Sequence, residues 1–277
     1  MNTLVLGVTR RPGRTVVEAF AALGAMWSLV EMHAHFFQES AIRGLCAFGS
    51  MVLVSIVWAI YRVRVLSTVV LPVPQSNTRI EVVFGDLFAQ DGLRVVAVND
   101  FFDSKLGRPV SEMSLHGVLL KKVLGGHPDA FDRQVDAQLS NEPFVTVTRA
   151  EGKDRRFEIG STALVQANNA DYLLFALSRT DSATCKASCD VAMLWDALDR
   201  MWQRARVESH GKPIVLPLVG SGLAGVGLPP RELLYLIMLS AVVATRRNHI
   251  AACIRVVLHS DQSENIDLRG VELYWRT

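Results

Sequence analysis

The sequence predicts an α/β domain built on a layered sheet, preceded by a hairpin of two membrane-length helices. Three observations carry this prediction. The hydrophobic excess lies largely before residue 75, strand-like and helix-like patterns alternate after residue 78, and glycine-bounded loops follow two of the strand-like runs. Strands separated by helices in a domain of this size favour a sheet covered by helices. The chain is therefore expected to divide into residues 1–64, a linker over 65–77 and a domain over 78–277.

Composition limits the classes of function. The 29 basic and 27 acidic residues leave a net charge of only +2, so there is no electrostatic case for a nucleic-acid partner. The mean hydropathy of +0.25 is high for a purely soluble protein. The cysteines show no disulfide framework, and no second ligand pair lies near Cys185 and Cys189, so neither disulfides nor a metal site is expected.

The N-terminal hairpin is predicted from two apolar segments. Residues 44–61 carry no charge and span roughly 27 Å as a helix, close to the thickness of a bilayer core. Residues 15–30 form a weaker candidate, because Glu18 lies in the first turn, where a charge is tolerated only near the headgroups. No cleavage site for a signal peptide is evident. The alternative for residues 44–61 is a buried helix of a soluble core.

Basic residues flank both segments and predict their orientation. Arg10, Arg11 and Arg14 precede the first segment, and Arg62 and Arg64 follow the second. Positive charge stays on the cytoplasmic side, so both chain ends are expected there in a multi-pass arrangement. The prolines after residue 70 cannot continue a helix and favour a linker before the domain.

Strand-like and helix-like hydrophobic patterns alternate along the domain over residues 78–277. Strands are expected at residues 79–84, 93–98, 144–149, 163–167, 172–178, 214–219, 254–259 and 271–275, and helices at 114–123, 128–139, 189–208 and 230–248.

Two loops in this domain have the composition of a nucleotide site. An apolar run over 80–84 ends in Gly85 and Asp86, and a buried run over 213–219 leads into a glycine-rich stretch over 220–225. Glycine-rich loops leading into a helix leave backbone N–H groups free for phosphate oxygens. Ligands of α/β sheets lie at the carboxyl ends of the strands, where both loops fall. This pattern indicates a site for an ADP-ribose-like ligand, in a sensor or an enzyme.

Four blocks in a fixed order carry a family resemblance. They are Gly85-Asp86-Leu87-Phe88, residues 95–99 ending in Asn99, Ser114-Leu115-His116-Gly117, and residues 216–225. Their succession resembles a macro domain, whose fold is a mixed sheet flanked by helices. With two spans in front, nearly the whole chain resembles the transmembrane–macro effectors of type II Thoeris antiphage systems.

The resemblance implies a role for each matching residue. Asp86 would accept from the adenine 6-amino group, as a carboxylate suits an amine, and Leu87 and Phe88 would flank the base. Asn99 would contact the distal ribose. The backbone of the last loop would wrap the diphosphate, since glycines permit close approach, and its residues are Gly220, Ser221, Gly222, Leu223, Ala224 and Gly225.

One block departs from the family pattern. Macro domains usually have a glycine-rich loop shortly after the asparagine, whereas this chain has residues 99–103 and then the block containing His116 and Gly117. The first phosphate loop is therefore rebuilt, which suggests a ligand other than plain ADP-ribose. Asp103, His116 and Gly117 are candidates for its distal end. His116 packing locally, and Asp100 and Asp103 acting as turn residues, are the alternatives.

The function implied by the resemblance is that of an antiphage effector in the bacterial inner membrane. A TIR-domain partner would make a second messenger from NAD, histidine-ADP-ribose, and the macro domain would bind it. The chain would then form a homo-oligomer whose hairpins breach the membrane and abort infection. No catalytic residue, cofactor or metal is expected.

Two other functions stay open from the sequence. A membrane-anchored hydrolase of ADP-ribosyl groups or NAD would use Asp100, Asp103 and His116 as general acid or base. A passive adaptor would use the hairpin only as an anchor.

Overall fold

The computed structural model describes residues 3–36, 44–64, 66–222 and 225–276. The chain divides into two compact units. The first comprises Met1–Ser67 with Asp267–Arg269, and the second comprises Thr68–Ile266 with Gly270–Thr277.

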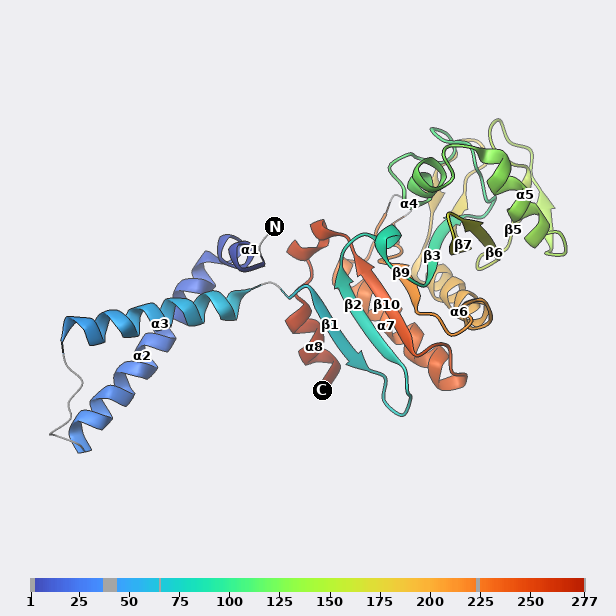
Figure 1. The fold of residues 1–277 in the computed structure, drawn as a ribbon. Coiled ribbons are helices and arrows are strands. Elements are labelled where there is room, and N and C mark those ends of the chain that lie inside the picture. The colour runs from blue at the N-terminus through green and yellow to red at the C-terminus, as the bar shows by residue number, and fades with distance from the viewer. Residues whose placement is uncertain (1–2, 37–43, 65, 223–224, 277) are drawn as a thin grey trace. The chain divides into compact units, whose positions relative to one another are not determined.

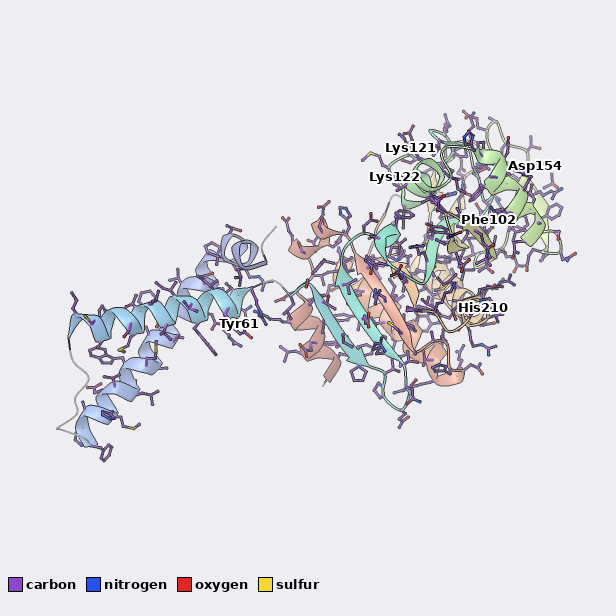
Figure 2. All side chains as sticks on the ribbon, in the orientation of Figure 1. Tyr61, Phe102, Lys121, Lys122, Asp154 and His210 are labelled. Atoms are coloured by element: carbon purple, nitrogen blue, oxygen red, sulfur yellow. The ribbon has the colours of Figure 1, made fainter. Side chains whose placement is uncertain are left out.

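Helices make up the N-terminal part of the first unit: α1 (Thr3–Arg10), α2 (Pro12–Phe36) and α3 (Leu45–Val63). Helices α2 and α3 pack against each other, and each is long and apolar enough to cross a membrane (Figure 1). The predicted segments 15–30 and 44–61 lie within them almost entirely, and α2 continues past residue 30 to Phe36. Tyr61 is half exposed near the end of α3 (Figure 2).

The buried residues of α3 lie along one stripe of the helix. Its buried residues are Ser55, Ala59 and Val63, spaced by one helical turn, and α2 buries none. The Ser55 hydroxyl donates to the Met51 carbonyl at 2.8 Å, so the buried oxygen is satisfied within the helix. Long apolar side chains of both helices are exposed, among them Phe20, Trp27 and Leu53.

The second unit is built on a mixed sheet. Within the described residues it has eight strands: in order β1 (Thr68–Pro72), β2 (Arg79–Phe84), β10 (Cys253–Leu258), β9 (Ile214–Pro217), β3 (Leu93–Asn99), β7 (Ala170–Thr180) and β6 (Thr162–Ala167), with β8 (Ala187–Ser188) pairing β7. The central strands from β2 to β7 are parallel, and β1 and β6 are antiparallel edges. A separate hairpin joins β4 (Phe144–Thr146) and β5 (Arg155–Phe157).

Helices cover both faces of the sheet. The short elements α4 (Leu115–Val118) and η3 (Leu119–Val123), with α5 (Pro128–Gln138), cover a core cluster on one face that includes Val96, Val98 and Phe131. Helices α6 (Val191–Glu208) and α7 (Pro230–Arg247) pack together, and the fully buried Trp202 indole donates to Ser240 at 3.0 Å between them. The remaining elements are η2 (Leu87–Ala89), η4 (Ser260–Glu264) and α8 (Leu268–Arg276).

The structure confirms the predicted fold class, and two predicted segments were wrong. The strand expected at 271–275 lies in α8, where Leu268 and Val271 are buried three residues apart, which is helical spacing. Part of the expected linker is strand β1, whose Val69 and Leu71 point inward in alternation. Pro72 ends that strand at the edge of the sheet, a position that tolerates proline.

Candidate functional site

The carboxyl ends of the parallel strands bring the predicted ligand residues to one edge of the sheet (Figure 1). Asp86 follows β2, Asn99 ends β3, and the loop beginning at Leu218 follows β9. The register aligns these ends, because Leu258 of β10 pairs with Phe84 and the preceding residue pairs with Pro217. The turn at Asp86 and the loop after β9, which the resemblance assigns to adenine and to phosphate, thus lie side by side along the sheet edge, with only the end of β10 between them.

The turn at Asp86 is fixed by backbone and side-chain hydrogen bonds. The Gly85 N–H donates to the Leu258 carbonyl at 2.9 Å, and Asp86 Oδ1 accepts from the Phe88 N–H at 2.9 Å, starting η2. Asp86 is exposed, and among the hydrogen bonds of the described residues none uses its Oδ2. One carboxylate oxygen is therefore available to an amine donor.

The two residues after Asp86 differ in exposure. Leu87 is 4% exposed and belongs to the core cluster, so its side chain lies below the edge. Phe88 is half-buried, with its ring centroid 6.3 Å from that of Tyr172. Of the pair expected to flank adenine, Phe88 keeps a partly exposed ring.

The loop after β9 is folded on itself around Gly220. The Val226 N–H donates to the Gly220 carbonyl at 3.0 Å, and the Ser221 hydroxyl donates to the Leu218 carbonyl at 2.6 Å. Gly220 has φ +83°, and a Cβ there would lie 2.8 Å from the Val226 side chain, so this position requires glycine.

The tip of this loop offers backbone donors. Ser221, Gly222 and Gly225 are exposed, and within the described residues their N–H groups make no hydrogen bond. Such groups, together with the N-terminus of the long helix α7, suit a diphosphate. Leu223 and Ala224, also expected in the site, lie outside the described residues.

The segment after β3 is closed by a buried ion pair. Asn99 Nδ2 donates to Asp103 Oδ2 at 2.8 Å, and the Asp103 N–H donates back to Asn99 Oδ1 at 3.1 Å. Asp103 is fully buried, pairs with the equally buried Arg149 at 3.0 Å and accepts from the Lys153 N–H at 2.7 Å. Its carboxylate therefore has its partners within the protein, and Asn99 is held by the same network.

Asp100 forms a second buried pair. Its carboxylate accepts from the Thr180 N–H at 3.0 Å and lies 3.2 Å from Arg156 Nε. Burial raises the pKa of Asp100, and the Thr180 hydrogen bond and the arginines oppose that effect. The Phe101 ring lies 3.8 Å from the Arg149 guanidinium and 4.9 Å from that of Arg156, so cation–π contacts join the two pairs.

His116 and Gly117 are both buried in the short helix α4. The His116 ring packs 5.5 Å from that of Phe131, and burial, with the charge of Lys153, lowers its pKa to about 3. A Cβ on Gly117 would lie 2.2 Å from the Ser111 carbonyl oxygen, and its N–H donates to the Ser114 hydroxyl at 2.9 Å. These contacts match the local packing that the sequence left as the alternative for His116.

Phe102 completes the rebuilt segment. Its side chain, labelled in Figure 2, is fully buried. The Phe102 ring meets the Phe157 ring edge-on, with centroids 5.7 Å apart. The segment after β3 is thus anchored by aromatic packing as well as by ion pairs, where glycines would have left it open.

His259 also lies at this edge of the sheet and was not among the residues that the sequence reasoning proposed. It follows β10 directly, between the Asp86 turn and the Gly220 loop in strand order, and its exposed ring lies 3.2 Å from Asp261. The available signal was its position at the end of a predicted parallel strand.

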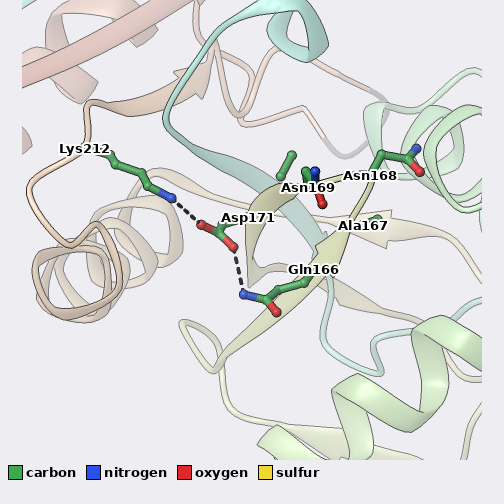
Figure 3. A pocket seen from close by; sticks show the side chains of 7 residues that line it. Gln166, Ala167, Asn168, Asn169, Asp171 and Lys212 are labelled. Atoms are coloured by element: carbon green, nitrogen blue, oxygen red, sulfur yellow. Dashed lines mark hydrogen bonds and ion pairs between the residues drawn. The ribbon is translucent and has the colours of Figure 1, made fainter.

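A shallow hollow lies at the opposite edge of the sheet (Figure 3). It has a volume of about 520 Å³ and is lined by Gln166, Ala167, Asn168, Asn169, Ala170, Asp171 and Lys212. Lys212 and Gln166 hold the Asp171 carboxylate at 3.0 Å and 2.9 Å, and the Lys212 hydrogen bond lowers its pKa. Since these residues precede β9 and join β6 to β7, the hollow is separate from the ligand edge.

Comparison with known proteins agrees with this arrangement. The family model described as "Thoeris protein ThsA, Macro domain" matches residues 80–259, more than half of the chain. The comparison with curated proteins gives no match.

Solved macrodomain structures from Oceanobacillus iheyensis share the fold. A point mutant is 11% identical with a TM-score of 0.51, covering 76% of this chain and 99% of that one. The macrodomain with ADP is 11% identical with a TM-score of 0.51, over 76% and 97% of the two chains. A glycine-to-valine mutant with ADPR is 12% identical with the same TM-score of 0.51, over 76% and 100%. With the match over residues 80–259, this chain belongs to the macro-domain family of the Thoeris protein ThsA.

Proposed function

We propose that this chain is a membrane-anchored effector that reads an ADP-ribose-derived nucleotide at the carboxyl edge of its sheet. One observation carries the proposal. The exposed Asp86 carboxylate, with a free oxygen, and the exposed donors of the Gly220 loop lie at one edge, separated by a single strand end. Adenine needs an acceptor for its amine, and a diphosphate needs clustered N–H donors.

The ligand is proposed to be histidine-ADP-ribose, made from NAD by a TIR-domain protein. Two related structures are described with ADP and ADPR, which supports the nucleotide portion. The segment after β3 is closed by the Asp100 and Asp103 ion pairs, so the distal end of the ligand meets a surface unlike a glycine-rich loop. This difference supports a distal group other than a plain ribose.

The proposed output is membrane disruption. The helices α2 and α3 would form a hairpin in the bacterial inner membrane, with both chain ends in the cytoplasm. Ligand binding would favour a self-associating state, which requires that the ligand bind that state more tightly. The clustered hairpins would then breach the membrane and stop growth of the infected cell. Loss of phage protection on deleting residues 1–64, with ligand binding retained, is the expected result.

The burial of the three candidate acid–base side chains supports ligand binding without turnover. Asp100 and Asp103 are fully buried in ion pairs with arginines, and His116 is 5% exposed with a pKa lowered to about 3. A general acid or base must reach the proton that it transfers. The burial of these side chains argues against a role in general acid–base catalysis.

Calorimetric titration of the full chain in detergent tests the proposal. We expect binding of ADP-ribose and tighter binding of histidine-ADP-ribose, with no change in either ligand by chromatography. Asp86→Ala should weaken both about tenfold or more, as expected for loss of a hydrogen bond to a charged group. Asp91→Ala removes a neighbouring exposed carboxylate and serves as the matched control. Undiminished binding by Asp86→Ala, or conversion of the ligand, contradicts the proposal.

A further inference from the structure

A series of side-chain hydrogen bonds holds the Asp86 turn from the sheet below it. Arg255 on β10 donates Nη1 to Gln90 Oε1 at 3.2 Å, and Gln90 Nε2 donates to the Asp86 carbonyl at 3.2 Å. Gln90 follows η2 directly, so the series spans the turn that carries Asp86. The Ala89 N–H also donates to that carbonyl at 3.3 Å.

The base of the series is a rigid, buried charge. Glu81 is 8% exposed and faces Arg255 as its paired residue in the β2–β10 ladder. Arg255 approaches it with two nitrogens, at 2.8 Å and 2.7 Å, and Arg79 donates to its other oxygen at 2.8 Å. Burial raises the pKa of Glu81, but hydrogen bonds from the two arginines outweigh burial and leave the pKa below its usual value.

The chemistry of Gln90 suits its position. A side-chain amide both accepts from a guanidinium and donates to a carbonyl, which a carboxylate or an ammonium group does not do. The planar fork of Arg255 serves Glu81 and Gln90 at once, a geometry that lysine does not reproduce.

Resting on the proposed function, we propose that Gln90 and Arg255 are positioning residues for adenine recognition. They fix the main chain at Asp86, so that its free Oδ2 meets the 6-amino group of the base. Neither side chain is assigned a contact with the ligand. Their effect is confined to the adenine end, since the Gly220 loop is held by its own hydrogen bonds.

The experiment compares ADP-ribose with inosine diphosphate ribose, which carries an oxygen in place of the 6-amino group. The full chain in detergent is titrated calorimetrically with each ligand. The wild type should prefer ADP-ribose about tenfold, as expected for a hydrogen bond to a charged acceptor. In Gln90→Ala, ADP-ribose affinity should fall at least about threefold while affinity for the inosine ligand holds, so the preference shrinks by that same factor.

Two further variants separate positioning from folding. Arg255→Lys keeps a positive charge beside Glu81 but loses the bond to Gln90, and should reduce the preference as Gln90→Ala does. Gln203→Ala, which removes an exposed glutamine on α6, should leave both affinities unchanged.

Each outcome has a defined meaning. An unchanged preference in Gln90→Ala overturns the inference alone, and so does an equal loss for both ligands, because that indicates a general structural role. A wild type that binds neither ligand overturns the proposed function and this inference together.

Discussion

Two segments at the same sheet edge differ in burial and in how they are held in place. The loop after β9 is exposed, glycine-rich and held by a few bonds of its own, whereas the segment after β3 is buried and tied by the Asp100 and Asp103 ion pairs. The first leaves backbone donors free for a group common to many nucleotides. The second presents a fixed surface whose two carboxylates are already paired. Stability and recognition should therefore respond differently to substitutions in the two segments.

The largest expected effect is on folding stability in the segment after β3. Asp103→Ala leaves Arg149 buried without its carboxylate, which should lower the free energy of unfolding by roughly 3–5 kcal/mol. In a domain of this size the midpoint of thermal unfolding should fall by about 10 °C. Asp171→Ala breaks a half-exposed pair with Lys212 and should cost no more than about 1 kcal/mol. Equal losses in the two variants would contradict the contrast.

A second effect concerns the dependence of stability on pH. His116 has its pKa lowered from 6.5 to about 3 in the folded protein. Below pH 6.5 the unfolded chain therefore binds a proton that the folded chain does not, so stability falls with falling pH. The loss should reach about 2 kcal/mol by pH 5.

His116→Leu should remove this part of the pH dependence of the free energy of unfolding. Denaturant unfolding between pH 6.5 and 5 measures it. Replacing the exposed His127 at the start of α5 should leave the slope in place, since His116 is retained. A slope that persists unchanged in His116→Leu would refute the assignment.

A smaller effect on stability than that of Asp103→Ala is expected in the loop after β9. Gly220→Ala places a side chain at φ +83° beside Val226, which should cost about 1–2 kcal/mol. The displaced loop should also bind ADP-ribose about tenfold more weakly, measured by calorimetry. Gly222→Ala meets no atom of the described residues within 4 Å and has no positive φ, so the stability of this variant should be unchanged. A Gly220→Ala protein with normal affinity would show that the loop does not set the site.

The exposed strand ends at Asp86 and Gly220 were predictable from the sequence, and the buried ion pairs after β3 were not. Buried parallel strands read as apolar runs, so the strand ends at Asp86 and Gly220 followed from local pattern. The partner of Asp103 lies 46 residues along the chain, and no local pattern pairs the two. Local pattern also failed for α8, where aromatic and β-branched residues suggested a strand in a segment that packs as a helix.

Strand β1 gives the correction of the expected linker a physical meaning. It runs antiparallel to β2 with Thr68 opposite Val83, so the chain enters the sheet beside the Asp86 turn. Only residues 64–67 separate that entry from the end of α3, so the five Cα–Cα steps from Val63 to Thr68 reach at most about 18 Å. A flexible linker of thirteen residues would absorb small movements of the turn. A connection of four residues leaves far less slack between the end of α3 and strand β1 than thirteen residues would.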